Sequence, residues 1–510
     1  MQSAPGFASG SEVFHESLKR RGRDSDHTEG KVKDMQMPRE FGTFHIIGIG
    51  GIGMSAIAEI LVAMGYSVQG SDQKDSPNVK RLRDKGVRVF IGHDAINLVG
   101  AKNVVISSAV KAGNPELEAA RAKGLTIIRR AEMLAELMRL YSTVSVTGTH
   151  GKTSTTSLIA HIFAETGLDP TVITGGIVNN WGSNARLGSG PWMIVEADES
   201  DGTFTRLPSQ IGVITNIDPE HLDFFGSVEA MHAAYETFIR QVPFYGLLVA
   251  CVDHGVVADM LRRLNLQHDG RPIVTYGCGE DADARMLTLA SDGHSSVFDV
   301  AFNARVPGGA RTLKGLRVPA PGRHNALNAL ASIVVAAAAG ASDDEIRAAL
   351  LTFAGVKRRF QFMGEWNGVS IFDDYGHHPA EIAAVLEAAR AGARGRVIAV
   401  VEPHRYTRVR DLFDDFCGCF YNADTVVVAP LYTAGEAPID GINQHTLAEG
   451  IRSRGHKAVL AIDSPRELVP MIQRNGRAGD MVVCLGAGNS TEWANALPDW
   501  LGEAPRLAGE

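Results

Sequence analysis

The sequence predicts an α/β protein with three domains: an N-terminal Rossmann-like domain, a central P-loop ATPase-type α/β domain and a C-terminal Rossmann-like α/β domain. The chain has 510 residues, which is too long for one ordinary hydrophobic core. From Phe44 onwards, short apolar segments alternate with segments whose apolar residues recur at helical spacing, as in parallel sheets covered by helices. Glycine-rich segments follow the first expected strand of the first two domains, where α/β folds bind phosphate groups.

The first domain is expected over residues 41–141. Its first strand, Phe44–Ile47, leads into the glycine-rich segment Gly48–Gly53, and a helical pattern follows. The alternation then continues, which predicts a βαβ-type open sheet. Further strands are expected at Tyr66–Val68, Val87–Ile91 and Val104–Ser107.

The glycines of this segment, with an acidic residue downstream, match a dinucleotide-binding fingerprint. Gly48, Gly50 and Gly53 have the spacing Gly-x-Gly-x-x-Gly, Gly51 adds a fourth glycine, and Asp72 follows Gly48 by 24 residues. This geometry requires only a diphosphate at a helix N-terminus, so the bound molecule can be a nicotinamide cofactor or a UDP-sugar. From this domain alone, a dehydrogenase remains open.

The second domain, expected over residues 142–355, begins with a nucleotide-phosphate loop between a β-like segment and a helical one. The glycines let backbone N–H groups turn toward one anion, Lys152 can reach the β- and γ-phosphates of ATP, and the Thr153 hydroxyl can bind Mg²⁺. Val146 stands where the full motif has a glycine. The predicted ATP-binding residues of the loop are Gly148, Thr149, His150, Gly151, Lys152, Thr153 and Ser154.

Two later strands of this domain end in acidic residues and a histidine. An apolar strand leads into Glu196, the first of four carboxylates among residues 196–201. These carboxylates repel one another, so a hard divalent cation with oxygen ligands explains the group better than a solvated acidic loop. His221 follows another strand and is expected at the same edge of the sheet. We therefore predict Thr153, Glu196 and His221 as metal ligands.

The third domain is expected over residues 356–510, again with strands and helical segments in alternation. Two loops rich in histidine, arginine and tyrosine, Asp373–Pro379 and Glu402–Arg408, each follow a strand-like segment. Such side chains suit the binding of a carboxylate and of charged intermediates. Strands are expected at Val397–Val401, Thr425–Val428, Ala458–Ile462 and Met481–Leu485.

Composition argues against several classes of protein. The formal net charge of −8 disfavours a nucleic-acid binder, and no segment has the length and apolar character of a membrane span. Five scattered cysteines have neither disulfide nor zinc spacing, which fits a reducing cytoplasm. The first forty residues hold seven basic and seven acidic side chains and few large apolar ones, so we expect residues 1–40 to form a flexible tail without a secretory signal.

Taken in order, the motifs of all three domains resemble those of the Mur ligases, the ATP-dependent amide-forming enzymes of peptidoglycan precursor synthesis. The resemblance covers residues 44–501 and depends on the order of the motifs more than on any one of them. It implies an acid–amino-acid ligase whose first domain binds UDP-N-acetylmuramate, whose central domain binds ATP and whose third domain carries the amino acid. The motifs are residues 48–55, 107–109, 148–154, 184–188, 196–201, 216–223, 322–325, 373–379 and 403–408.

The resemblance also implies roles for individual residues. The two arginines of the third domain would bind the carboxylate of the amino acid, and the catalytic set would combine them with Lys152, Glu196, His221 and His377. The implied ligand contacts are Gly48, Gly50, Gly51, Gly53, Asp72, Ser107, Ser108 and Asn184 for the UDP-sugar, His324, Asn325 and Asp374 for the adenine and ribose of ATP, and Tyr375, His377, Arg405 and Arg408 for the amino acid.

The metal ions and substrates follow from the same resemblance. Many Mur ligases bridge two metal ions with a carbamylated lysine shortly after the position of His221, but residues 222–239 contain no lysine. This absence favours the L-alanine-adding branch and leaves the ligands of the second metal open. The implied cofactors are ATP and two Mg²⁺ ions, with Mn²⁺ as a substitute. The substrates would be UDP-N-acetylmuramate, activated as an acyl phosphate on its lactyl carboxylate, and L-alanine.

Other functions remain as alternatives. A related ligase joins a free peptide to UDP-N-acetylmuramate in cell-wall recycling, although Tyr375 and Gly376 favour the alanine ligase. A nicotinamide dehydrogenase with an accessory ATPase domain is a remote alternative, because no hydride-transfer group stands out. A non-catalytic nucleotide switch would not need the arginine- and histidine-rich loops of the third domain. Both a monomer and a homodimer are compatible with the sequence.

Overall fold

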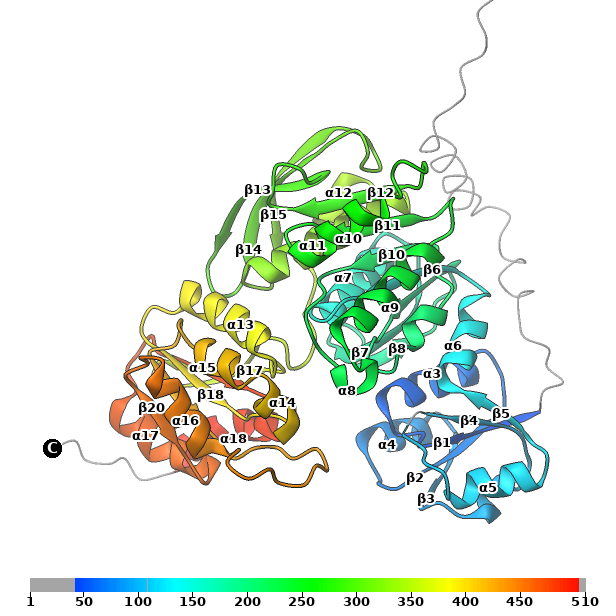
Figure 1. Cartoon of the computed structure of the whole chain (residues 1–510), viewed down its shortest axis with the longest axis horizontal. Helices are drawn as coiled ribbons and strands as arrows, with labels where there is room; N and C mark the ends of the chain where they lie inside the picture. Colours follow the sequence, from blue (N-terminus) through cyan, green and yellow to red (C-terminus); the bar gives the residue numbers. More distant parts are fainter. Residues whose placement is uncertain (1–41, 108, 504–510) are drawn as a thin grey trace, which may run out of the picture. The chain divides into compact units, whose positions relative to one another are not determined.

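The computed structural model describes residues 42–107 and 109–503. It confirms the predicted fold class, because three β-sheets, each accompanied by helices, make up a mixed α/β protein (Figure 1). The elements gather into two compact units. The first unit contains the first sheet and most of the second sheet. The second unit contains the third sheet, together with one end of each of three strands of the second sheet and the first residues of one helix of the central domain. The tail expected over residues 1–40 lies outside the described residues.

The first sheet has five parallel strands in the order β3-β2-β1-β4-β5. The strand order reverses between β1 and β4, where doubly wound sheets bind ligands, and the first glycine loop follows β1 there. Strand β2 continues past its predicted end at Val68, because Gly70 leaves room for Ile49 of the loop: a Cβ on Gly70 would lie 2.7 Å from Ile49 Cδ1. The elements are β1 (Thr43–Ile47), α3 (Ile52–Ala63), β2 (Val68–Asp72), α4 (Pro77–Asp84), β3 (Arg88–Ile91), η2 (Ala95–Leu98), β4 (Ala101–Ile106), α5 (Pro115–Ala122), β5 (Thr126–Arg129) and α6 (Arg130–Met138).

The second sheet has ten strands in the order β15-β14-β13-β12-β11-β10-β6-β9-β7-β8. Strand β6 lies between β10 and β9 in parallel register with both, so the phosphate loop that follows it is flanked by the ends of two other strands. The elements are β6 (Ser142–Thr147), α7 (Lys152–Glu165), β7 (Thr171–Val178), β8 (Ser183–Arg186), β9 (Trp192–Glu196), η3 (Thr203–Arg206), β10 (Ile211–Ile214), α8 (Leu222–Phe225), α9 (Val228–Gln241), β11 (Leu247–Cys251), α10 (Gly255–Leu264), β12 (Ile273–Gly277), β13 (Ala284–Ser291), β14 (Ser296–Phe302), β15 (Arg311–Val318), α11 (Arg323–Ala338) and α12 (Asp343–Leu351).

The third sheet has six strands in the order β16-β17-β21-β18-β19-β20, all parallel except β16 at one edge. Both arginine- and histidine-rich loops follow parallel strands of this sheet, β17 and β18, at their carboxyl ends. The elements are β16 (Gln361–Trp366), β17 (Val369–Asp374), α13 (Pro379–Gly392), β18 (Val397–Val401), α14 (Tyr406–Asp411), α15 (Phe413–Gly418), β19 (Thr425–Val428), α16 (Gln444–Ser453), β20 (Val459–Ala461), η4 (Pro465–Glu467), α17 (Leu468–Asn475), β21 (Met481–Leu485) and α18 (Ser490–Glu503).

Burial follows the predicted patterns. The parallel strands β11, β18 and β21 are buried along their whole length, as expected of strands covered on both faces. Within the residues that the structure describes, no helix combines the length and the apolar character needed to cross a membrane.

Candidate active site

The phosphate loop between β6 and α7 is clamped against the segment that follows β10. Gly148 has φ +131°, and a Cβ there would lie 2.1 Å from Thr215 Oγ1, so only glycine fits. The His150 N–H donates to Asn216 Oδ1 at 2.7 Å, and the Thr215 hydroxyl donates to the His150 carbonyl at 2.6 Å. Gly151 also has positive φ, +81°, directly before the helix. These contacts hold the loop backbone in one shape.

Lys152 lies inside this loop and is paired with a carboxylate that the sequence did not single out. Its Nζ donates to the Gly148 carbonyl at 2.6 Å and lies 2.8 Å from the Glu199 carboxylate. Burial alone would lower the pKa of Lys152, but the negative charges of Glu199, Asp198 and Glu196 outweigh burial and raise it. The lysine is therefore a fixed positive charge at the mouth of a glycine loop.

Glu196, the predicted metal ligand, lies at the end of β9 against the start of α7 and the strand β7. Its carboxylate accepts hydrogen bonds from the Thr153 hydroxyl at 3.0 Å, the Thr174 hydroxyl at 3.0 Å and the Gly175 N–H at 2.6 Å. The structure thus brings the predicted pair Thr153 and Glu196 together. It places His221 with a different carboxylate.

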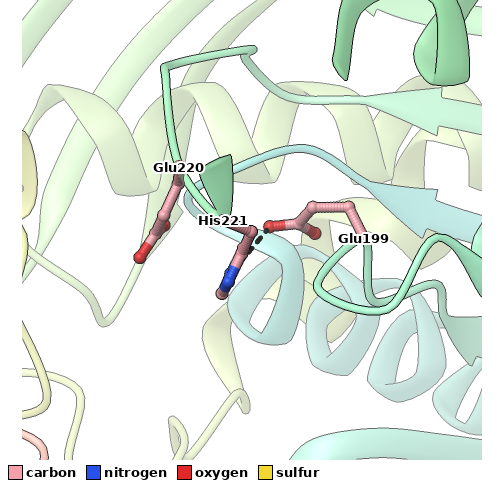
Figure 2. A group of neighbouring side chains, drawn as sticks. All are labelled: Glu199, Glu220 and His221. Atoms are coloured by element: carbon pink, nitrogen blue, oxygen red, sulfur yellow. Dashed lines mark ion pairs between the residues drawn. The ribbon is translucent and has the colours of Figure 1, made fainter. Parts of the chain in front are cut away.

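Glu199, Glu220 and His221 form the cluster best suited to a metal ion among the described residues. One ligand atom from each residue lies within 4.8 Å of the others, and His221 Nε2 is 3.9 Å from Glu199 Oε1 (Figure 2). Glu199 is 2% exposed, and burial raises its pKa to about 7 although Lys152 opposes the shift. Two carboxylates and an imidazole offer the oxygen and nitrogen donors that a divalent cation takes, and a cation would also neutralise buried negative charge. The donor set therefore fits a metal.

The other two carboxylates of residues 196–201, Asp198 and Asp201, have partners outside this cluster. Asp198 accepts from the N–H and the hydroxyl of Ser200, and Asp201 pairs with Arg130 at 2.8 Å. Glu199 was not singled out from the sequence. Strand β9 ends at Glu196, so the alternation of side chains along a strand does not predict where Glu199 points.

A second carboxylate–histidine group braces the outer side of the phosphate loop. Asp218 lies 3.3 Å from His150 Nε2 and 3.1 Å from His254 Nε2. The hydrogen bonds of both histidines lower the pKa of Asp218 well below its usual range. His254, the residue before α10, was not predicted as a site residue, because only the fold brings it near the loop.

The first glycine loop is braced by residues of its own domain. The Gly50 N–H donates to Asp72 Oδ2 at 2.8 Å, and Asn78 Nδ2 donates to the Gly50 carbonyl at 2.8 Å. Asn184, although it belongs to β8, reaches the start of α3, where its Nδ2 donates to the Ile52 carbonyl at 2.7 Å. The structure therefore brings three predicted UDP-sugar contacts, Gly50, Asp72 and Asn184, to one helix N-terminus. Ser107 is half-buried after β4, and Ser108 lies outside the described residues.

The predicted amino-acid site in the second unit gathers aromatic rings and cationic groups. The rings of Tyr375 and His377 are 5.2 Å apart, and His377 is 5.5 Å from His404. Arg408 donates to His404 Nδ1 at 3.1 Å. Arg405, the residue before α14, has φ +69°. Burial and the positive charges around it lower the pKa of His404 to about 3, so this ring is neutral near neutral pH. His404 was not among the predicted site residues, although it adjoins Arg405.

The three residues predicted near adenine and ribose also lie in the second unit. The charges of Arg359 and Glu381 act on the pKa values of both His324 and Asp374. Burial lowers the pKa of His324 to about 4 and raises that of Asp374 to about 6. Asp374 accepts hydrogen bonds from two backbone N–H groups, and Asn325 donates to the Pro321 carbonyl at 2.8 Å.

Comparison with known proteins places these features in a family context. Three family models match successive parts of the chain: the Mur ligase family catalytic domain over residues 43–142, the Mur ligase middle domain over 146–336 and the Mur ligase glutamate ligase domain over 358–488. The chain is 57% identical over 462 residues to a protein of Parvibaculum lavamentivorans named UDP-N-acetylmuramate–L-alanine ligase, covering 91% of this chain and 93% of that protein.

Two solved structures are similar over almost the whole chain. A UDP-N-acetylmuramate–alanine ligase from Thermotoga maritima matches with a TM-score of 0.74 and 27% identity, covering 90% of this chain and 98% of that one. A murein peptide ligase from Psychrobacter arcticus matches with a TM-score of 0.64 and 25% identity, covering 91% and 100%.

Proposed function

Because this chain belongs to the Mur ligase family, we propose that it joins L-alanine to the lactyl carboxylate of UDP-N-acetylmuramate and cleaves ATP to ADP and phosphate. The product would be a precursor of peptidoglycan. The observation that carries this proposal is the buried group at the second glycine loop, where Lys152 pairs with Glu199 beside Glu220 and His221. A fixed cation, a glycine loop at a helix N-terminus and a carboxylate–histidine cluster suit the transfer of a phosphoryl group.

The first step is the transfer of the γ-phosphoryl group of ATP to the lactyl carboxylate. One carboxylate oxygen attacks phosphorus in line, the bond to the bridging oxygen breaks, and ADP leaves with that oxygen, which gives an acyl phosphate. Lys152 and N–H groups of the loop would hold the γ-phosphate, and the contacts with Thr215, Asn216 and Asp218 would hold the loop backbone in place.

The second step is the attack of the L-alanine amine on the activated carbonyl. A new C–N bond forms, inorganic phosphate leaves, and the amine nitrogen loses its proton. Arg405 and Arg408 would bind the carboxylate of L-alanine, and Tyr375 and His377 would orient its amine and side chain. The neutral His404 supports this arrangement, because its Nδ1 accepts a hydrogen bond from Arg408 and so holds that side chain.

We propose Mg²⁺ as the metal, with Mn²⁺ as a substitute. Glu199, Glu220 and His221 would hold one ion, and Thr153 with Glu196 would hold a second beside Lys152. When bound, the ions supply positive charge that screens the substrate carboxylate and the phosphate oxygens.

The first glycine loop would bind the diphosphate of the UDP-sugar, with Gly48, Gly50, Gly51 and Gly53 at the start of α3 and Asn184 beside them. His324, Asn325 and Asp374 would contact the adenine and ribose of ATP. We propose that the protein works in the cytoplasm on these small molecules.

Phosphate release tests this proposal. The protein is incubated with ATP, Mg²⁺ and UDP-N-acetylmuramate, and then separately with L-alanine, glycine, L-serine or a tripeptide. We expect the highest kcat/KM with L-alanine and none with Lys152→Ala. The peptide ligase alternative predicts the highest value with the tripeptide. The 57% identity over 462 residues to a protein named UDP-N-acetylmuramate–L-alanine ligase supports the former.

A further inference from the structure

The loop that follows β18 holds the arginines of the proposed amino-acid site in an unusual backbone conformation. Arg405 has φ +69° and ψ 132°, a combination that L-residues rarely adopt. Such a conformation persists only where surrounding contacts enforce it. The contacts of this loop therefore identify the residues that determine where the two arginines lie.

Tyr432 holds the backbone of this loop on both sides of His404. It belongs to the segment between β19 and α16, coloured orange in Figure 1. The Tyr432 N–H donates to the Pro403 carbonyl at 2.8 Å, and the Arg405 N–H donates to the Tyr432 carbonyl at 2.9 Å. Together they form an isolated parallel β-bridge between His404 and Tyr432. This bridge holds the backbone directly before the positive φ of Arg405.

The ring of Tyr432 also stacks on the ring of His404. The two centroids are 5.3 Å apart and the planes differ by 15°. The ring of Tyr432 is seated against Gly488, where a Cβ would lie 2.4 Å from Tyr432 Cγ. Because His404 Nδ1 accepts the hydrogen bond of Arg408, a fixed His404 ring fixes the position of that guanidinium group.

Glu436, four residues after Tyr432, holds the start of α14. Its carboxylate accepts from the Thr407 N–H at 3.1 Å and from the Thr407 hydroxyl at 2.7 Å. Thr407 immediately precedes Arg408 in the first turn of this helix. The segment 432–436 thus contacts the chain on both sides of Arg405 and at Thr407, the residue before Arg408.

We propose that Tyr432 and Glu436 are positioning residues for the amino acid: Tyr432 acts through His404 and Arg405, and Glu436 acts through Thr407. The proposal rests on the proposed function, because it takes Arg405 and Arg408 as the carboxylate-binding pair. Neither residue is assigned a part in the bond-making steps. Their loss should therefore weaken amino-acid binding selectively.

Steady-state kinetics of Tyr432→Leu, Tyr432→Phe and Glu436→Ala test this inference. We expect Tyr432→Leu and Glu436→Ala to raise the KM for L-alanine about tenfold or more while the KM for ATP stays within about twofold. Tyr432→Phe keeps the stacked ring and the backbone bonds, so it should restore the KM for L-alanine to within about twofold of wild type. Tyr421→Leu is the matched control, because Tyr421 is a tyrosine of the same sheet domain that is 93% exposed.

Equal increases in the KM values for L-alanine and ATP would overturn the proposal, as would a Tyr432→Phe variant as impaired as Tyr432→Leu. A second readout does not depend on ligation: NMR of ¹⁵N-histidine-labelled protein, free of substrates. Loss of the stacked ring in Tyr432→Leu should shift the His404 ring signals, whereas Tyr421→Leu should leave them in place. Unchanged His404 signals in Tyr432→Leu would refute the positioning role. A wild-type protein that does not ligate L-alanine would instead refute the proposed function and leave the NMR test standing. Glu436→Ala carries the kinetic test if Tyr432→Leu does not fold.

Discussion

Glu116→Gln is the perturbation that most directly tests the electrostatics of the first domain. Glu116 lies in α5 and is 0% exposed. Its Oε2 accepts from the Ser71 hydroxyl at 2.5 Å and lies 3.1 Å from His93 Nδ1, and its Oε1 accepts from Asn97 Nδ2 at 2.6 Å. Burial alone would raise the pKa of Glu116, but the nearby His45 and the hydrogen bonds from Ser71 and Asn97 outweigh burial and lower the pKa from 4.5 to about 2.

The size of the expected effect follows from the difference between the pKa of Glu116 in the folded protein, about 2, and its ordinary value of 4.5. A carboxyl whose pKa is lower when folded stabilises the fold above its unfolded pKa, and this contribution is lost as the pH falls toward the folded pKa. This pKa difference contributes about 3 kcal/mol to the free energy of unfolding at pH 7 and about 1 kcal/mol at pH 3. Glutamine cannot carry the charge, so Glu116→Gln should lose most of this contribution at pH 7 and less at pH 3.

Hydrogen exchange measured by mass spectrometry on peptides from β1 and β2 reports this loss where it occurs. At the same pH, the variant should exchange these amides about 100-fold faster than wild type at pH 7 and about tenfold faster at pH 3. Glu118→Gln is the matched control in the same helix, because its half-exposed pair with Arg121 should contribute less than about 0.5 kcal/mol. Equal exchange in the two variants at pH 7, or a difference that does not shrink at pH 3, would refute the reasoning.

Three further predictions concern the proposed active site. Lys152→Ala should abolish ATP-dependent phosphate release while circular dichroism stays unchanged; appreciable residual ligation would contradict its role at the γ-phosphate. Glu199→Gln should raise the Mg²⁺ concentration needed for half-maximal activity about tenfold or more, since one of the clustered carboxylates is lost, and an unchanged Mg²⁺ titration would exclude Glu199 as a ligand. Arg408→Ala should raise the KM for L-alanine about 100-fold and leave the KM for ATP within about twofold, and equal effects on both would argue against carboxylate binding.

Much of the fold and part of the candidate site could be predicted from the sequence, because the decisive signals are local. Glycine spacing, apolar periodicity and polar residues after strands lie within short stretches of chain, and they predicted the three α/β sheets and the phosphate loop. They also predicted that Thr153 and Glu196 lie together, and the hydrogen bond of 3.0 Å between them agrees.

The remaining site residues could not be predicted, because their positions depend on turns and on contacts far apart in sequence. Glu199 follows the end of a strand, where alternation no longer indicates which way a side chain points. His254 reaches Asp218 from the start of α10, 36 residues away. Tyr432 stands 28 residues after His404, and only the pairing of β18 with β19 brings them side by side. No local pattern carries such information.

The two glycine loops show why the same motif supports different chemistry. The first loop, residues 48–53, contains no lysine or arginine, and the Asp72 carboxylate that a nicotinamide cofactor would need for its ribose accepts the loop's own Gly50 N–H. Such a loop can hold a diphosphate through N–H groups and the helix dipole, but it places no cation at a reacting atom. The second loop places Lys152 beside Glu199 at 2.8 Å and near a carboxylate–histidine cluster. A diphosphate that is only bound needs the first arrangement, whereas a phosphoryl group that is transferred needs the second. A ligase therefore accounts for both loops, whereas hydride transfer by a dehydrogenase leaves the second loop unexplained.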